Sequence, residues 1–204
     1  MKQSYKKSYF MKIYNLLRNL GLLVFTFAML SVFLKILSLM YFKVVLNFPF
    51  KNQILNGIEL LYKGAIIITL VVLVSLLFLI LIELSKRLSN DSLLNLAKSI
   101  IATSRLRHFL KQYKITSSGE NESYVQSENR IIDSFNHAVN KSVIDLTRKE
   151  LKLFIKIPKE AQSKEILNKQ KDLIKQHIFS FYSEYIISDF KEENFSLWIV
   201  GTKK

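Results

Sequence analysis

Two long apolar runs near the N-terminus dominate the hydropathy pattern of the chain. The second run, residues 64–84 (GAIIITLVVLVSLLFLILIEL), contains a single charged side chain, Glu83, one position before its end. About 20 consecutive apolar residues in a helix match the ~30 Å hydrocarbon core of a bilayer. The first run, residues 20–42, contains only Lys35 as a charged residue and is too long for the apolar core of a signal peptide. The pattern therefore predicts a transmembrane hairpin over residues 20–84.

Small and polar residues recur along the first apolar run at helical spacing. Gly21, Ala28, Ser31, Lys35 and Ser38 are separated by steps of 7, 3, 4 and 3, so they share one face of a helix. Small residues let two helices approach closely in lipid. Gly21, Ala28, Ser31 and Ser38 are therefore candidates for a helix-packing face, which would favour a homo-oligomer or a larger membrane complex.

Lysine and arginine are unevenly distributed around the two runs. Residues 1–19 contain five basic side chains and residues 85–107 contain five more, whereas the connecting residues 43–63 contain three. Basic residues close to transmembrane helices accumulate on the cytoplasmic side. The sequence therefore predicts a multi-pass protein of the cell membrane with both termini in the cytoplasm, residues 1–19 being a basic cytoplasmic N-terminus.

Residues 85–120 are expected to form a membrane-proximal helix and a loop. Apolar side chains recur at helical spacing between Leu93 and Tyr113, and Asp91 is placed to cap this helix. Four basic residues near its end are candidates for a patch that binds acidic lipid headgroups or nucleic acid, with a solvated helix face as the alternative. They are Arg105, Arg107, Lys111 and Lys114.

Residues 121–204 are expected to form a small α+β cytoplasmic domain. The polar stretch 115–128 predicts a loop, and residues 130–140 predict either a short helix or an irregular lead-in. Further elements are predicted as strands at 142–147 and 151–157, a helix at 159–182, and strands at 185–190 and 195–201, the last two joined around KEEN. This order, strand–strand–helix–strand–strand, predicts an antiparallel sheet with a helix on one face.

Composition and motifs add charge but no catalytic signature. The 204-residue chain has a net charge of +14 and contains no cysteine, which excludes disulfides and thiolate metal sites. The sequence lacks the G-x-x-x-x-G-K-[ST] pattern of P-loop nucleotide hydrolases. His108, His137 and His177 do not have the spacing of metal ligands. We therefore expect no enzymatic activity, no metal and no cofactor.

The order of parts resembles a known family. The segments concerned are Leu96-Ala97-Lys98-Ser99-Ile100 after the apolar hairpin, LKLFIKIPKE at 151–160, and EYIISDF and FSLWIVG at 184–190 and 195–201. The pattern is similar to the membrane-anchored N-terminal region of FtsK-like coupling proteins of Gram-positive conjugative elements. In that family a motor ATPase follows, whereas this sequence ends at Lys204, where the motor would begin. The resemblance carries over no catalytic residue.

The resemblance implies a membrane anchor or adaptor that recruits a soluble DNA-translocating ATPase and other channel subunits in conjugation or type IV secretion. The alternatives are a two-helix membrane effector of phage defence with a nucleotide-sensing cytoplasmic domain, and a small accessory subunit without a ligand. Under the adaptor hypothesis the last hairpin and the helix before it would dock the partner, and contact with DNA would also be possible. The docking candidates are Lys169, Lys175, Phe190 and Trp198.

Overall fold

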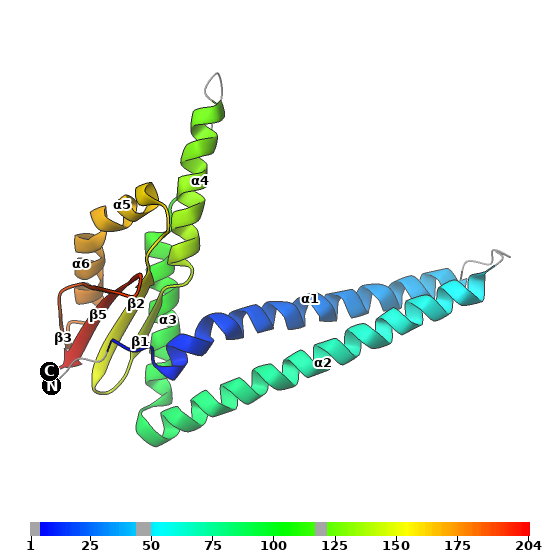
Figure 1. Ribbon diagram of the computed structural model, residues 1–204. Coiled ribbons are helices and arrows are strands. Elements are labelled where there is room, and N and C mark those ends of the chain that lie inside the picture. The colour runs from blue at the N-terminus through cyan, green and yellow to red at the C-terminus, as the bar shows by residue number, and fades with distance from the viewer. Residues whose placement is uncertain (1–4, 44–49, 117–121) are drawn as a thin grey trace. The chain divides into compact units, whose positions relative to one another are not determined.

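The computed structural model describes residues 5–43, 50–116 and 122–204 (Figure 1). Cα packing divides the chain into two compact units. One is the apolar hairpin, Ile13–Leu84, and the other joins the N-terminal residues through Lys12 to Ser85–Lys204. The second unit contains the α+β region predicted at 121–204, and it also includes the membrane-proximal region predicted at 85–120 and the first residues of the chain.

The hairpin unit is built from two helices that are long and apolar enough to cross a membrane. Helix α1 spans Tyr9–Lys43 and helix α2 spans Lys51–Asn90. The second helix begins 13 residues before the predicted position 64, because residues 51–63 contain no proline and place Ile54, Ile58 and Leu61 at helical spacing. The residues between the helices, 44–49, lie outside the described part of the chain.

Two side-chain contacts show that α1 and α2 pack antiparallel. A Cβ placed on Gly21 would lie 3.9 Å from Leu76 Cδ1, and Lys35 Nζ lies 5.3 Å from the centroid of the Tyr62 ring. From the first contact to the second, α1 runs forward by 14 residues and α2 runs backward by 14, as expected for antiparallel helices with aligned axes. In the most apolar window of each helix, 11% and 6% of the residues are buried. The remaining apolar side chains face outward, which suits contact with lipid rather than a soluble core.

The domain contains one antiparallel sheet (Figure 1). Its strands are β1 Val143–Leu146, β2 Glu150–Lys156, β3 Tyr185–Ile187, β4 Lys191–Glu193 and β5 Ser196–Lys203. The strand order is β1-β2-β5-β3, and β4 pairs with β5 next to β3. β3 pairs with the last residues of β5 and β4 with its first residues, so the two short strands form one interrupted edge.

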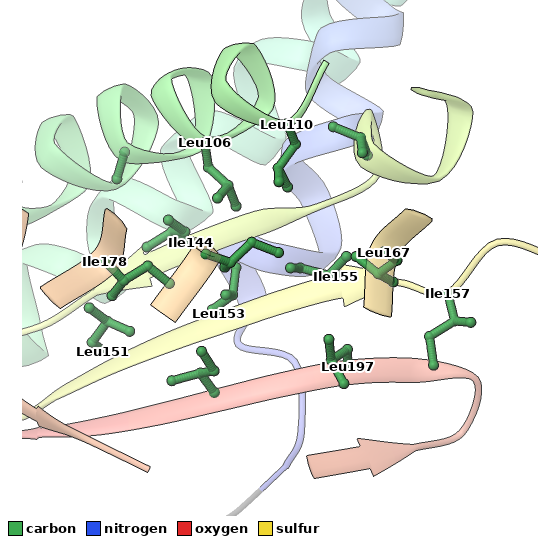
Figure 2. Packing of buried hydrophobic residues seen from close by; sticks show 14 of the residues in the cluster. Leu106, Leu110, Ile144, Leu151, Leu153, Ile155, Ile157, Leu167, Ile178 and Leu197 are labelled. Atoms are coloured by element: carbon green, nitrogen blue, oxygen red, sulfur yellow. The ribbon is translucent and has the colours of Figure 1, made fainter. Parts of the chain in front are cut away.

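Helices cover one face of this sheet. They are α3 Leu93–Leu110, α4 Glu122–Val139, α5 Ala161–Lys169 and α6 Lys171–Phe181. Their apolar side chains meet Ile144 of β1, Leu153 of β2 and Ile199 of β5, which are register partners on the same face. Figure 2 shows Leu106 and Leu110 of α3 pointing onto this layer. The predicted α+β class is confirmed, with four helices on this face in place of one.

Several boundaries differ from the predicted ones for local reasons. Ser92 caps α3 by accepting a hydrogen bond from Leu94 N at 3.2 Å, so the prediction of Asp91 as the cap is wrong. Residues 122–128 are helical although their polar composition predicts a loop. The helix predicted at 159–182 is divided at Gln170 into α5 and α6. The last hairpin turns at Asn194 and Phe195, both with positive φ, so KEE belongs to β4.

Candidate functional site

The N-terminal segment covers the second face of the sheet. Lys7 Nζ lies 3.7 Å from the centroid of the Phe154 ring, and Lys191 Nζ lies 4.0 Å from that of Tyr5. Phe154 and Trp198 meet edge to face at 5.1 Å beneath this segment, and each is 4% exposed. Burial, with a smaller effect of Lys156, lowers the pKa of Lys7. Residues 5–12 are therefore part of the domain and not a separate basic tail.

The last turn of α2 enters the same unit through a buried arginine. Arg87 Nη1 donates to Asp91 Oδ2 at 2.6 Å and to Leu146 O at 3.1 Å, while Nη2 donates to Asp145 Oδ1 of β1. The three charged side chains are between 4% and 6% exposed. At the position before Arg87, Lys86 Nζ lies 3.6 Å from the Tyr9 ring centroid. The starting turn of α1 and the final turn of α2 are thus both fixed within the domain.

Asp91 shows how the cluster keeps its charge. Burial alone would raise the pKa of this carboxyl group, but hydrogen bonds from Asn95, Arg87 and the Arg148 backbone N–H bring the pKa below its ordinary value. Asn95 Nδ2 donates to Asp91 Oδ1 at 2.7 Å, and Arg148 N donates to the same oxygen at 3.0 Å. Asp91 is therefore a carboxylate at neutral pH and balances the Arg87 guanidinium.

Side chains of α3 form hydrogen bonds with the main-chain groups on the outer edge of β1. Ser99 Oγ accepts from Leu146 N at 2.8 Å, and Thr103 Oγ1 accepts from Ile144 N at 3.0 Å. Arg107 Nε donates to Ser142 O at 2.9 Å. These α3 residues are four apart, and their partners are two apart along β1 and the residue before it. The helix therefore runs alongside the strand and takes the place of a neighbouring strand. One edge of the sheet is closed in this way.

The opposite edge, formed by β3, is open. Glu184 O accepts from Lys204 N at 3.0 Å and Ser188 N donates to Val200 O at 2.8 Å, so alternate residues of this segment bond to the β5 side. Main-chain groups alternate in direction along an antiparallel strand. The N–H and C=O of Ile187 are therefore directed away from β5, toward the open edge. A further strand could pair there.

A groove lies between this open edge and α6. It has a volume of about 540 Å³ and is lined mainly by apolar parts of Phe179, Ile186 and Ile187, with Lys175 at its side. Phe179 is 57% and Ile186 62% exposed. Lys175 Nζ forms an ion pair with Asp189, which lowers the pKa of that carboxyl group through the hydrogen bond and the lysine charge. We name these features, the groove and the open β3 edge, the α6–β3 groove.

The predicted docking residues fall in four different environments. Lys175 lines the α6–β3 groove, whereas Lys169 is an exposed residue of α5 whose Nζ lies 2.8 Å from Glu165 Oε1. Phe190 is partly buried against the core. Trp198 is 4% exposed, so its prediction as an exposed docking residue is wrong: the N-terminal segment and Phe154 cover it. Alternation along β5 could have indicated that this face also holds apolar residues.

The four predicted patch residues differ in their contacts. Arg107 is held against the β1 main chain, and Lys114 Nζ lies 2.7 Å from Asp133 Oδ2. The Arg105 guanidinium lies 4.3 Å from the Phe181 ring centroid, and Lys111 is the C-cap residue of α3. Arg105 and Arg107 are two positions apart on a helix and therefore point to different sides. Arg107 is therefore engaged at the sheet, whereas Arg105, Lys111 and Lys114 are exposed and remain candidates for a basic patch.

The predicted helix-packing residues lie toward α2 within the same hairpin. Gly21 faces Leu76, as described above, and Ser31 is 8% exposed with its Oγ donating to Phe27 O at 2.8 Å. Ala28 and Ser38 are half-buried. The close approach that small residues permit is therefore used between α1 and α2 of one chain.

His177 is held in an aromatic stack rather than in a polar site. Its ring stacks on Phe109 at 4.2 Å and meets Phe181 at 4.9 Å, and burial, with a smaller effect of Arg105, lowers its pKa. Among the described residues no group of three or more His, Cys, Asp or Glu side chains is arranged to hold a metal ion.

The α6–β3 groove offers apolar contact and main-chain hydrogen-bonding groups together. Those two features are what an extended peptide needs in a binding site, since pockets hold its side chains while the strand edge holds its backbone.

No known protein family, curated protein or solved structure matches the chain.

Proposed function

We propose that this protein is a membrane-anchored docking module whose domain captures an extended segment of a soluble partner in the α6–β3 groove. The observation that carries the proposal is the open edge at Ile187 beside the exposed side chains of Phe179 and Ile186. The other sheet edge is closed by α3, so within the described residues strand addition is left to the edge formed by β3 and β4. Main-chain pairing would supply affinity, and the groove would select side chains.

The contacts of the N-terminal segment support a location of both ends of the hairpin on one side of a bilayer. Tyr5 and Lys7 pack on Lys191 and Phe154, so residues before α1 and after α2 belong to one unit. A folded unit cannot be divided by a bilayer, and the hairpin therefore crosses it an even number of times. Together with the excess of basic residues at these ends, this supports a cytoplasmic domain.

The partner that we propose is a DNA-translocating ATPase of a conjugation or type IV secretion system. The proposal rests on the resemblance of the segments at 96–100, 151–160, 184–190 and 195–201 to the membrane region of FtsK-like coupling proteins. Two of these segments contribute β2 and β5, and a third contributes β3, the open edge. A module of this kind would hold the motor at the membrane without carrying out chemistry itself.

The test uses Phe179→Asp, which places a charge in the groove without touching the core because Phe179 is 57% exposed. The matched control is Phe195→Asp, since Phe195 is 80% exposed at the β4–β5 turn and is not among the groove residues. We expect both variants to reach the membrane in equal amounts. We expect Phe179→Asp alone to release the ATPase from the membrane and to lower DNA transfer between cells at least tenfold.

A second variant tests strand pairing directly. Ile187→Pro removes the N–H that faces the open edge, and proline is tolerated on edge strands when its missing donor faces away from the sheet. It should lower binding of the partner as Phe179→Asp does. If both variants retain the ATPase and transfer DNA like the control, the groove is not the docking site and the proposal is wrong.

A further inference from the structure

A second pocket lies between α3 and the residues that follow α6. It has a volume of about 390 Å³ and is lined by two cations, Lys98 and Arg105, by apolar surface of Ile101 and Phe181, and by Tyr182 and Ser183, which carry hydroxyl groups. Ile101 is 55% and Phe181 50% exposed. The pocket thus combines positive charge, hydroxyl groups and exposed apolar surface in one place.

The two cations are arranged to act on one ligand. Lys98 and Arg105 are seven positions apart on α3, so they lie on one face about 10 Å apart along the axis, with Ile101 between them. The Arg105 guanidinium lies 4.3 Å from the Phe181 ring centroid, which orients it at the pocket wall. Burial raises the pKa of Tyr182 despite the opposing effect of Arg105, so its hydroxyl group stays protonated and can donate to an anion.

These charges lack the acidic partners that several other basic residues of the domain have. Lys114, Lys164, Lys169 and Lys175 form ion pairs with Asp133, Glu192, Glu165 and Asp189. In the described part of the chain neither Lys98 nor Arg105 forms one. The acidic residue at the pocket rim, Glu184, has its Oε2 4.0 Å from Lys203 Nζ. The pocket therefore offers uncompensated positive charge to a ligand.

The chain also limits how far this pocket can lie from lipid. The apolar run of α2 ends at Leu84, α2 itself at Asn90, and α3 begins at Leu93. Lys98 is five residues and Arg105 twelve residues into α3, about 8 and 18 Å along the helix. Headgroups at the bilayer surface are therefore within reach of a domain attached by such a short segment, and at high local concentration.

From these observations we propose that the pocket binds the phosphate headgroup of an anionic phospholipid. Arg105 and Lys98 would hold the phosphate, the hydroxyl groups of Tyr182 and Ser183 would add hydrogen bonds, and Ile101 and Phe181 would contact the glycerol and upper acyl chain. The exposed apolar residues favour a lipid over free phosphate, because inorganic phosphate has no apolar part to bury. A bound headgroup would fix the orientation of the domain at the membrane surface.

The test measures lipid binding to the full-length chain in detergent by native mass spectrometry. The probes are short-chain phosphatidylglycerol, short-chain phosphatidylcholine and inorganic phosphate. Lys98→Gln and Arg105→Gln should each weaken phosphatidylglycerol binding by about fivefold, and the double variant by more than tenfold. The control, Lys111→Gln with Lys169→Gln, has the same net charge and should bind like the wild type. Arg105→Lys keeps the charge and should retain most of the affinity.

The outcomes separate the lipid from other sources of phosphate. Equal binding of phosphatidylcholine, or unchanged binding of phosphatidylglycerol by the double variant, would overturn the proposal. Displacement of the lipid by millimolar inorganic phosphate would assign the pocket to a free anion and overturn the choice of a lipid. This pocket shares no lining residue with the α6–β3 groove. Failure of one proposal therefore leaves the other intact.

Discussion

Arg87 at the end of α2 and Asp145 in β1 form a buried ion pair 58 positions apart in the sequence. The same guanidinium also bonds Asp91 and the Leu146 carbonyl oxygen, so one side chain connects the end of an apolar helix, the start of α3 and the edge of the sheet. An arginine suits this position because its planar fork donates in several directions at once.

Removing one partner of this pair should destabilise the domain strongly. Asp145→Ala would leave the Arg87 guanidinium buried with one carboxylate fewer, and we expect a loss of about 3 to 5 kcal/mol in the free energy of unfolding. Asp133→Ala breaks the Lys114–Asp133 pair, whose side chains are 58% and 56% exposed, and should cost about 1 kcal/mol or less. Urea unfolding of the full chain in detergent, followed by the fluorescence of Trp198, measures both. Equal losses would contradict the role assigned to Arg87.

A methyl group at Gly201 should disturb the sheet beneath the open edge. A Cβ there would lie 3.1 Å from Ile187 Cγ2 and 3.2 Å from Tyr185 Cβ. We expect Gly201→Ala to lower the free energy of unfolding by about 1 to 3 kcal/mol because these neighbours must move apart. Gly57→Ala is the control, since nothing lies within 4 Å of its added Cβ. The same urea titration applies, and a neutral Gly201→Ala would show that β3 adapts freely.

Tyr185 should make the domain sensitive to alkaline pH. Burial, with smaller effects of Glu184, Asp91 and Asp145, raises the pKa of its hydroxyl group from 10.0 to about 12, and the hydroxyl donates to Thr147 O at 2.8 Å. Because the pKa is higher in the folded state, the protonated Tyr185 hydroxyl group contributes fully to the free energy of unfolding below pH 10.0. This contribution is lost as the pH rises toward 12.

The variant Tyr185→Phe isolates this effect. It should be less stable than wild type at pH 8 by about 1 kcal/mol, because one buried hydrogen bond is lost. The difference should shrink between pH 10 and 12 as the wild-type hydroxyl group is forced to ionise. Urea midpoints of the two proteins across this range give the comparison. A constant difference would mean that the hydroxyl group titrates alike in folded and unfolded chains.

Cysteine labelling should reveal the orientation of the hairpin, because the chain contains no cysteine of its own. We expect Asn52→Cys, at the start of α2, to react with an impermeant reagent in whole cells. Lys169→Cys, on the exposed surface of α5, should react only after the cells are opened. The opposite pattern would place the domain outside the cell and exclude a cytoplasmic partner.

Local patterns explain which elements the sequence predicts correctly. Leu151, Leu153 and Ile155 alternate with Lys152 and Phe154 within one strand. Two strands joined by a short turn pair with each other, so the β1–β2 hairpin follows from neighbouring residues. The start of α4 differs because its first residues are polar, and its helical face becomes apolar only near Ile132 and Phe135. The polar composition of these residues predicts a loop, although they form the first turns of α4.

The candidate sites depend on contacts that no local pattern contains. Lys7 meets Phe154 and Tyr5 meets Lys191 across most of the chain length, so the cover on the second sheet face is not predictable from either segment alone. The open edge at Ile187 appears only once the strand order is known. Ser99 and Thr103, polar residues four apart on an otherwise apolar helix face, are a signal that could have revealed the contact between α3 and β1.

The N-terminal cover of the sheet imposes an order on biogenesis. Residues 5–12 are the first of the described residues to leave the ribosome, and β5, the inner strand that pairs on both sides, is the last strand to be made. The domain therefore completes its native packing only after β5 is made. In the proposed membrane topology both apolar helices insert, and return the chain to its starting side, before that point. A hairpin inserted with its ends on opposite sides would leave Phe154 and Trp198 uncovered, a state that quality-control proteases could recognise.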